Sequence, residues 1–83
     1  MKVQLRYFAS LREALGSGET AELPEGSTVG AARDLLIARG AEHARVLARG
    51  RAVRAALNQT MCGEADVLAE GDELAFVPPV TGG

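Results

Sequence analysis

The chain has 83 residues, of which 47% are apolar, and it carries 9 Lys and Arg side chains against 11 Asp and Glu side chains. This length fits one domain with a modest core, and the apolar content argues against disorder. The net charge of −2, without a long run of like charge, argues against a nucleic-acid partner.

The sequence also bears on compartment and on metal binding. It shows no secretory leader and no apolar run near the ~18 residues of a membrane span. We therefore expect a cytoplasmic protein without a membrane partner. The single Cys62 cannot form an internal disulfide, and no Cys/His cluster has zinc spacing, so no metal site is expected.

The first third of the chain predicts a strand, a short helix and a second strand. Apolar and polar residues alternate over residues 2–7, which is typical of a half-buried strand. Phe8, Leu11 and Leu15 then recur at helical spacing, and Gly16 is expected to end that helix. Residues 18–23 read as a second strand, which Pro24 ends.

The main helix is predicted after Thr28, which is a good N-cap. Gly40 stands where a left-handed glycine often ends a helix. The apolar stripe of this helix is expected to consist of Val29, Ala32, Leu35 and Leu36.

Shorter elements are predicted to follow. Residues 41–50 suggest a helical turn or two, residues 53–57 alternate as a third strand, and residues 60–62 suggest a short, poor strand. A loop is expected to carry Val67 and Leu68 inward.

The last strand is predicted before the tail, with Leu74 and Phe76 facing the core and Ala75 and Val77 facing outward. Strands around one dominant helix predict an α+β fold, with one sheet of four to five strands and the main helix packed on one face. The apolar first and last strands are expected to lie centrally in this sheet.

The chain ends on Pro78-Pro79-Val80-Thr81-Gly82-Gly83, a tail that we separate from a domain over residues 1–77. Pro78 and Pro79 lack the donors that a sheet ladder needs and would stop the last strand. Gly82 and Gly83 have no Cβ, so they fit a channel too narrow for other residues. The pattern favours a flexible probe with a reactive carboxylate at its tip, although a frayed end is the plain alternative.

Other candidate site residues are weaker. His43 has no catalytic partner in sequence and is predicted to be a surface residue. Cys62 lacks an evident base and is predicted to be a small, part-buried apolar residue. The mid-chain arginines and the acids that precede the tail are either solvated faces or surfaces that dock a partner.

Three segments carry a resemblance to a known family. They are GDELAFVPPVTGG at residues 71–83, YFASLRE at residues 7–13 and ALNQ at residues 56–59. The chain resembles the small, sulfur-carrying subunit of molybdopterin synthase, a ubiquitin-like β-grasp protein, over its whole length. It departs at Val77, where some relatives carry a second aromatic after Phe76.

The resemblance implies a carrier rather than an enzyme with its own active site. An ATP-dependent, ubiquitin-activating-like adenylyltransferase would adenylate Gly83, and a persulfide would convert it to a thiocarboxylate. The tail would thread into the large subunit of a heterotetrameric synthase, which converts cyclic pyranopterin monophosphate to the dithiolene. Gly82, Thr81 and Val80 would line the threaded segment, and Val77, Pro78 and Pro79 would meet the partner. The chain itself would bind no cofactor, and ATP would be used by the activating enzyme.

Two other readings remain open. One is a sulfur carrier for thiamine synthesis or tRNA thiolation, whose members share the Gly-Gly end but usually lack Pro-Pro-Val-Thr. The other is a ubiquitin-like modifier that is joined to lysines through the same carboxylate.

Overall fold

The computed structural model describes residues 1–78, which form five strands and three helices. In chain order these elements are β1 (Lys2–Tyr7), α1 (Ala9–Leu15), β2 (Gly18–Glu22), α2 (Val29–Arg39), α3 (Ala41–Leu47), β3 (Arg54–Leu57), β4 (Thr60–Cys62) and β5 (Glu73–Val77).

The strands form one mixed sheet in the order β2-β1-β5-β3-β4. β1 and β5 are parallel, with Leu5 opposite Leu74 and Tyr7 opposite Phe76. The pairs β1–β2, β3–β4 and β3–β5 are antiparallel. The predicted α+β fold is therefore confirmed, and the first and last strands lie centrally as expected.

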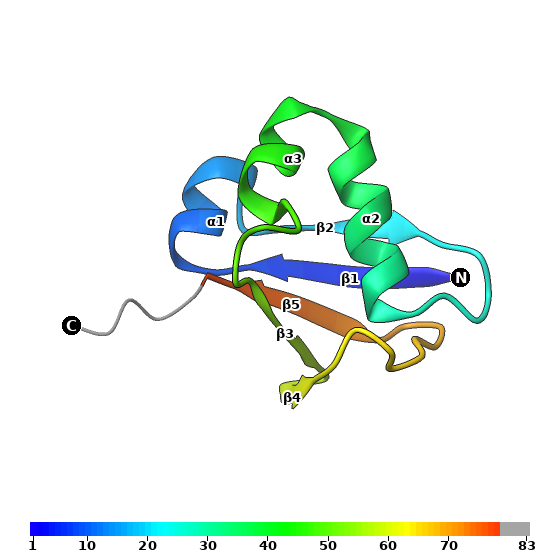
Figure 1. Ribbon diagram of the computed structural model, residues 1–83. Coiled ribbons are helices and arrows are strands. Elements are labelled where there is room, and N and C mark those ends of the chain that lie inside the picture. Colours follow the sequence, from blue (N-terminus) through cyan, green and yellow to red (C-terminus); the bar gives the residue numbers. More distant parts are fainter. Residues whose placement is uncertain (79–83) are drawn as a thin grey trace.

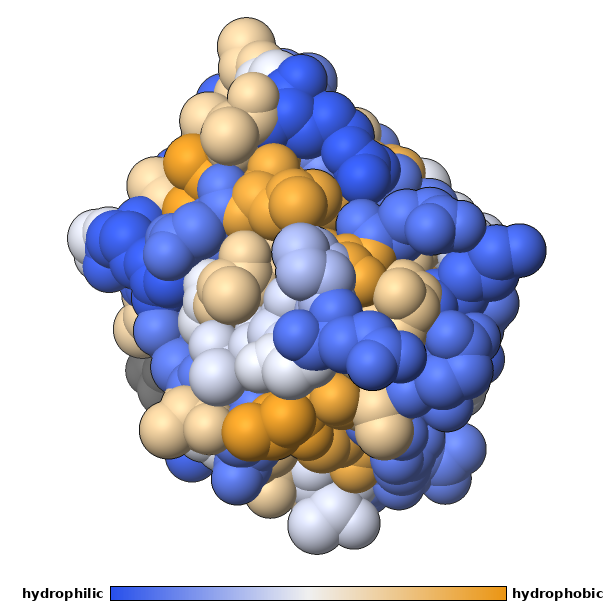
Figure 2. Space-filling model, turned by 90° about the vertical axis from the view of Figure 1, so that its right-hand side faces the viewer, coloured by the Kyte–Doolittle hydropathy of each residue, from blue (hydrophilic) through white to orange (hydrophobic). Residues whose placement is uncertain are grey.

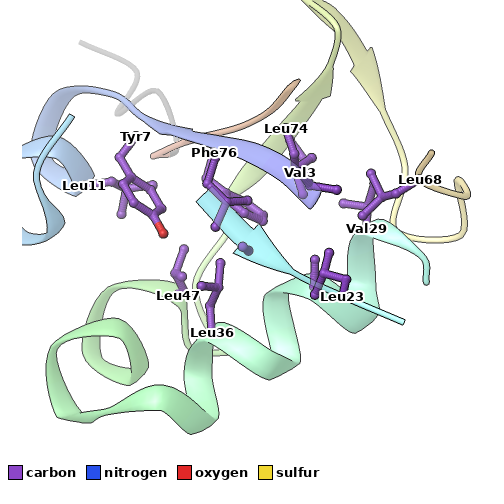
Figure 3. Close-up of a cluster of buried hydrophobic side chains, with 14 of the residues drawn as sticks. Val3, Tyr7, Leu11, Leu23, Val29, Leu36, Leu47, Leu68, Leu74 and Phe76 are labelled. Atoms are coloured by element: carbon purple, nitrogen blue, oxygen red, sulfur yellow. The ribbon is translucent and has the colours of Figure 1, made fainter. Parts of the chain in front are cut away.

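All three helices cover one face of the sheet, and the other face is open (Figure 1). The core lies between these two layers, where apolar side chains of the sheet meet those of the helices (Figure 3). Alternate residues of β1 are buried, which confirms the period of two that the sequence shows. The largest fully buried side chains are Tyr7, Phe76, Leu5, Leu36, Leu47, Leu74, Val3 and Val29.

All three predicted helix ends are formed at the expected residues, but the backbone conformation differs at one of them. The Thr28 hydroxyl accepts a hydrogen bond from the Ala31 N–H at 3.1 Å, which confirms the N-cap of α2. Gly16 ends α1 with a φ of 90°, a left-handed conformation that favours glycine. Gly40 follows the last residue of α2, as predicted, but its φ of 173° is extended and not left-handed.

The predicted stripe of α2 is wrong at one position, because Leu35 is exposed and Arg33 is buried in its place. A buried guanidinium needs partners for its N–H groups, and this one has them. Its Nη1 donates to Glu64 Oε2 at 2.9 Å. The other N–H groups donate to main-chain carbonyls at the end of α3 and in the segment that follows it, namely those of Leu47 at 2.7 Å, Ala48 at 2.7 Å and Arg51 at 3.1 Å.

Three further side chains differ from the sequence-based expectation. Phe8 is the N-cap residue that precedes α1, and it is 40% exposed. It therefore does not belong to the apolar stripe of that helix. Val67 is 61% exposed, whereas its neighbour Leu68 is buried as predicted. Ala75 lies on the open face but is only 5% exposed, because it sits between Arg6 of β1 and Ala56 of β3 in the centre of the sheet.

The β3–β4 hairpin turns at Asn58 and Gln59, whose φ values of 49° and 70° are both positive. The side chain of Asn58 donates to Asp72 Oδ1 and accepts from the Glu73 N–H, each at 3.0 Å. These bonds tie the hairpin to the start of β5. Within residues 1–78, no helix is both long and apolar enough to cross a membrane.

Candidate functional site

The candidate site begins where β5 ends, at Val77 and Pro78, both of which are half-buried. Val77 lies opposite Arg54 in the antiparallel pair with β3. The remaining predicted site residues lie outside the described residues and stay predictions; they are Pro79, Val80, Thr81, Gly82 and Gly83.

The base of the tail is held by strands on both sides. β5 pairs with β1 up to Phe76, and with β3 up to Val77. The Phe8 N–H adds a further bond to the Phe76 carbonyl at 3.2 Å. A central strand with two neighbours has all of its ladder bonds, so the point from which the tail leaves is fixed relative to the domain.

The open face of the sheet carries exposed apolar side chains that the sequence-based interpretation missed. Phe8 and Met61 are 40% and 55% exposed. The Arg6 guanidinium lies over the Phe8 ring, 5.8 Å from its centroid. The signal was present in the alternation of β1, since Phe8 continues the outward-facing positions of Lys2, Gln4 and Arg6.

A polar cluster under the helices joins the sheet to α2 and α3. Glu19 of β2 accepts hydrogen bonds from the Tyr7 hydroxyl at 2.7 Å and contacts His43 Nε2 at 3.0 Å. It also pairs with Arg39 of α2. His43 lies edge-on to the Tyr7 ring, with centroids 6.4 Å apart. The prediction that His43 is a surface residue is therefore wrong, because its side chain is only 19% exposed.

This cluster shifts the acidity of two of its members. Burial and the hydrogen bond to Glu19 raise the pKa of Tyr7 well above its ordinary value. Burial alone would raise the pKa of Glu19, but hydrogen bonds from His43 and Tyr7 and the charge of Arg39 outweigh it and hold that pKa below its ordinary value. Glu19 is therefore ionised in the folded protein at neutral pH.

The direction of that shift gives a prediction for Glu19→Gln. A carboxyl whose pKa is lowered by folding stabilises the fold above its unfolded pKa, and this contribution is lost as the pH falls through the folded pKa. We expect the variant to be less stable than the parent at pH 7, and the difference to shrink towards about pH 3. Urea unfolding at both pH values measures it. Equal differences at both values would contradict the assignment.

A pocket of about 420 Å³ lies on the helix side of the sheet, beside the β3–β4 hairpin. Phe76 and Val29 contribute apolar walls, and Cys62 lines it as well. Burial and the charge of Asp66 raise the pKa of the Cys62 thiol, which opposes formation of a nucleophilic thiolate. This agrees with the prediction that Cys62 is a small, part-buried residue rather than a nucleophile. Within the described residues, no group of three or more His, Cys, Asp or Glu side chains could hold a metal ion.

The fold defines a class of protein: a β-grasp domain of the ubiquitin-like kind, in whose sequence the last central strand is followed by a Gly-Gly end. The chain belongs to the ThiS family, whose model matches residues 5–83. It is 38% identical to the molybdopterin synthase sulfur carrier subunit of Escherichia coli K12 over 81 residues, which cover 98% of this chain and 99% of that protein.

Solved structures agree on the fold. The crystal structure of SAMP1 from Haloferax volcanii is similar with a TM-score of 0.80 and 28% identity, and the match covers 100% of both chains. A complex of subunits 1 and 2 of the molybdopterin-converting factor from Helicobacter pylori contains a similar chain, with a TM-score of 0.71, 23% identity and 100% coverage of both chains. At 23% identity, the second likeness is evidence for the fold alone.

Proposed function

We propose that this protein is the sulfur-carrier subunit of a molybdopterin synthase and that Gly83 is the carrier residue. The observation that carries the proposal is the match over nearly the full length to a molybdopterin synthase sulfur carrier subunit. The family model extends to Gly83 and so includes the Gly-Gly end. The described structure supports it by fixing the base of the tail at Val77 while leaving the open sheet face uncovered by the domain's own helices.

The proposed chemistry has three steps on Gly83. A carboxylate is a poor acyl donor, so a carboxylate oxygen first attacks the α-phosphorus of ATP and pyrophosphate leaves. The sulfur of a persulfide then attacks the acyl carbon, and AMP leaves with the bridging oxygen. Reductive cleavage of the sulfur–sulfur bond by a thiol then leaves a thiocarboxylate on Gly83. An adenylyltransferase supplies the first step, and its need for ATP fits a cytoplasmic location.

The thiocarboxylate is then delivered within a complex. The proposed partner is the synthase large subunit, which encloses the tail and supplies the active site where cyclic pyranopterin monophosphate receives sulfur. Support comes from the 38% identical Escherichia coli relative, which is named as a subunit of molybdopterin synthase. The Helicobacter pylori chain of the same fold comes from a complex of subunits 1 and 2 of the molybdopterin-converting factor. Val77, Pro78 and Pro79 would meet the large subunit, with Val80, Thr81 and Gly82 inside its channel. This chain would itself bind no cofactor.

Intact-mass spectrometry tests the first half of the proposal. After incubation with ATP, the activating enzyme and a sulfur donor, the protein is expected to gain the mass of one oxygen-to-sulfur exchange at Gly83. Absence of this mass change in the unaltered protein would refute the carrier function.

The Gly82→Val variant tests whether the tail must be narrow next to the Gly83 carboxylate. It adds a β-branched side chain, which restricts φ and ψ and widens the thread, but it leaves the carboxylate in place. We expect it to lose thiocarboxylate formation, sulfur delivery or both, with an unchanged thermal unfolding curve. Thiolation and delivery at the parent rate would show that narrowness is not what selects the paired glycines.

A second candidate function is protein modification. The likeness to SAMP1, which is described as a small archaeal modifier protein, favours it. In that case the Gly83 carboxylate would be joined to lysines of other proteins. Recovery of a ladder of lysine conjugates, rather than a pterin-binding large subunit, would support this function over the first. Sulfur delivery for thiamine synthesis or tRNA thiolation is a third candidate function. Recovery of a different acceptor protein with this chain would support it.

A further inference from the structure

The arginines divide into two groups according to their partners. Of the eight arginines of the chain, five pair with carboxylates: Arg6, Arg33, Arg39, Arg45 and Arg49. The other three are Arg12, Arg51 and Arg54, and all three are exposed. Within residues 1–78, no carboxylate lies within ion-pair distance of any of them.

These three arginines gather at one end of the domain, where β5 ends, and we call them the arginine rim. Arg54 lies directly opposite Val77 in the sheet. Arg51 stands three residues earlier, and its carbonyl accepts a hydrogen bond from the buried Arg33 at 3.1 Å, so its backbone is held in place. Arg12 lies on α1, which starts directly after β1. Figure 1 shows α1 and the segment before β3 at the same end of the sheet as the end of β5.

Carboxylates that have no ion pair within residues 1–78 lie mostly at the other end. Glu22 lies opposite Lys2 at the start of β1. Glu70 accepts a hydrogen bond from the Lys2 N–H at 3.0 Å, which places it at the same end. Figure 2 faces this end and shows mainly hydrophilic residues, with hydrophobic colour in small separate areas. The exception is Glu13, next to Arg12 on α1. The net charge of −2 therefore conceals a separation of charge along the domain.

We infer that the arginine rim docks on carboxylates that surround the tail entrance of the synthase large subunit. The inference rests on the proposed function. In that function the tip of the tail is anionic and the acceptor carries a phosphate, so the interior of the large subunit's pocket must be cationic. A cationic interior would repel the arginine rim. The complementary surface is therefore a cationic pocket with an acidic border, which accepts an anionic tail that leaves a cationic domain end.

The charge separation acts on encounter more than on final affinity. Complementary charges steer two proteins into the correct orientation and raise the association rate, and salt screens this effect. At about 0.1 M ionic strength, the screening length of ~10 Å is short enough that only the end of the domain that faces the partner contributes. The arginine rim thus orients the domain so that the tail faces the entrance of the large subunit before the two proteins touch.

The test measures the association rate of this protein with its large subunit by stopped flow at about 0.05 and 0.5 M salt. The variant combines Arg51→Glu with Arg54→Glu, both at exposed positions outside the core. We expect its association rate at low salt to fall about tenfold, and the salt dependence of the rate to weaken or reverse. The charge-preserving variant, Arg51→Lys with Arg54→Lys, is expected to associate at nearly the parent rate.

The matched control places the opposite change at the other end of the domain. Glu22→Arg with Glu25→Arg alters the net charge by the same amount in the opposite sense, and it is expected to leave the rate nearly unchanged. If this control raises the association rate by the same factor, net charge alone determines the rate, and the inference about the arginine rim is wrong. A parent rate that does not change with salt, or that the Arg→Glu changes do not slow, would also overturn it. If the unaltered protein forms no complex, the proposed function fails together with the inference.

Discussion

Deletion of Gly82 and Gly83 is expected to abolish sulfur delivery completely while leaving the stability of the domain unchanged. The reacting carboxylate is lost with Gly83, and no other group of the chain replaces it in the proposed chemistry. The buried core cluster of the described residues lies between Val3 and Phe76, so the deletion removes none of it. A synthase assay with the large subunit and a pterin acceptor measures delivery.

Thermal unfolding of the truncated and full-length proteins provides the control. The two curves should nearly overlay. A large fall in the melting temperature on truncation would mean that the tail packs on its own domain, which contradicts a tail that other proteins enclose. Sulfur delivery by the truncated protein would contradict the assignment of Gly83.

Phe76→Ala is expected to destabilise the fold by ~3–5 kcal/mol, the usual range for truncation of a buried aromatic side chain. Phe76 is 1% exposed, lies on the central strand β5 and belongs to the cluster between the sheet and the helices (Figure 3). A domain of this size has a total stability of only about 5–15 kcal/mol, so the loss is a large part of it. Chemical denaturation measures the change.

Val77→Asp is the matched control, because Val77 is the next residue on the same strand and faces the opposite side. Its side chain is half-buried and lies opposite Arg54, which a new carboxylate can approach. We expect the fold to remain intact and binding to the large subunit to weaken. If Val77→Asp unfolds the protein while Phe76→Ala does not, the orientation of β5 is the reverse of the one described here.

Local patterns in the sequence determine much of this fold. The alternation over β1 predicts its buried face, because successive side chains of a strand point to opposite sides wherever the strand lies. Thr28 predicts the start of α2, because capping needs only a hydroxyl and an N–H a few residues apart. The Gly-Gly end likewise indicates the proposed carrier residue without reference to any contact.

The tertiary structure decides what these local patterns cannot. Periodicity predicts which face of a helix is apolar. The elements that pack against the helix determine which residues at the edge of that face are buried. The end of α3 and the segment after it bring main-chain carbonyls to Arg33, so a charged residue is buried, whereas Leu35 is exposed. In the same way, α3 brings His43 to Glu19, 24 positions away in the chain.

The surroundings of the tail also depend on the tertiary structure. The sequence shows eight arginines and a concentration of acids before the tail, but not which of these charges pair. Ion pairing depends on distances between residues far apart in the chain, and it leaves the cations Arg12, Arg51 and Arg54 at the end of the domain where β5 ends. Chemistry at the tip of the tail follows from local sequence, whereas the surface around its base exists only once β1, β3 and β5 lie side by side.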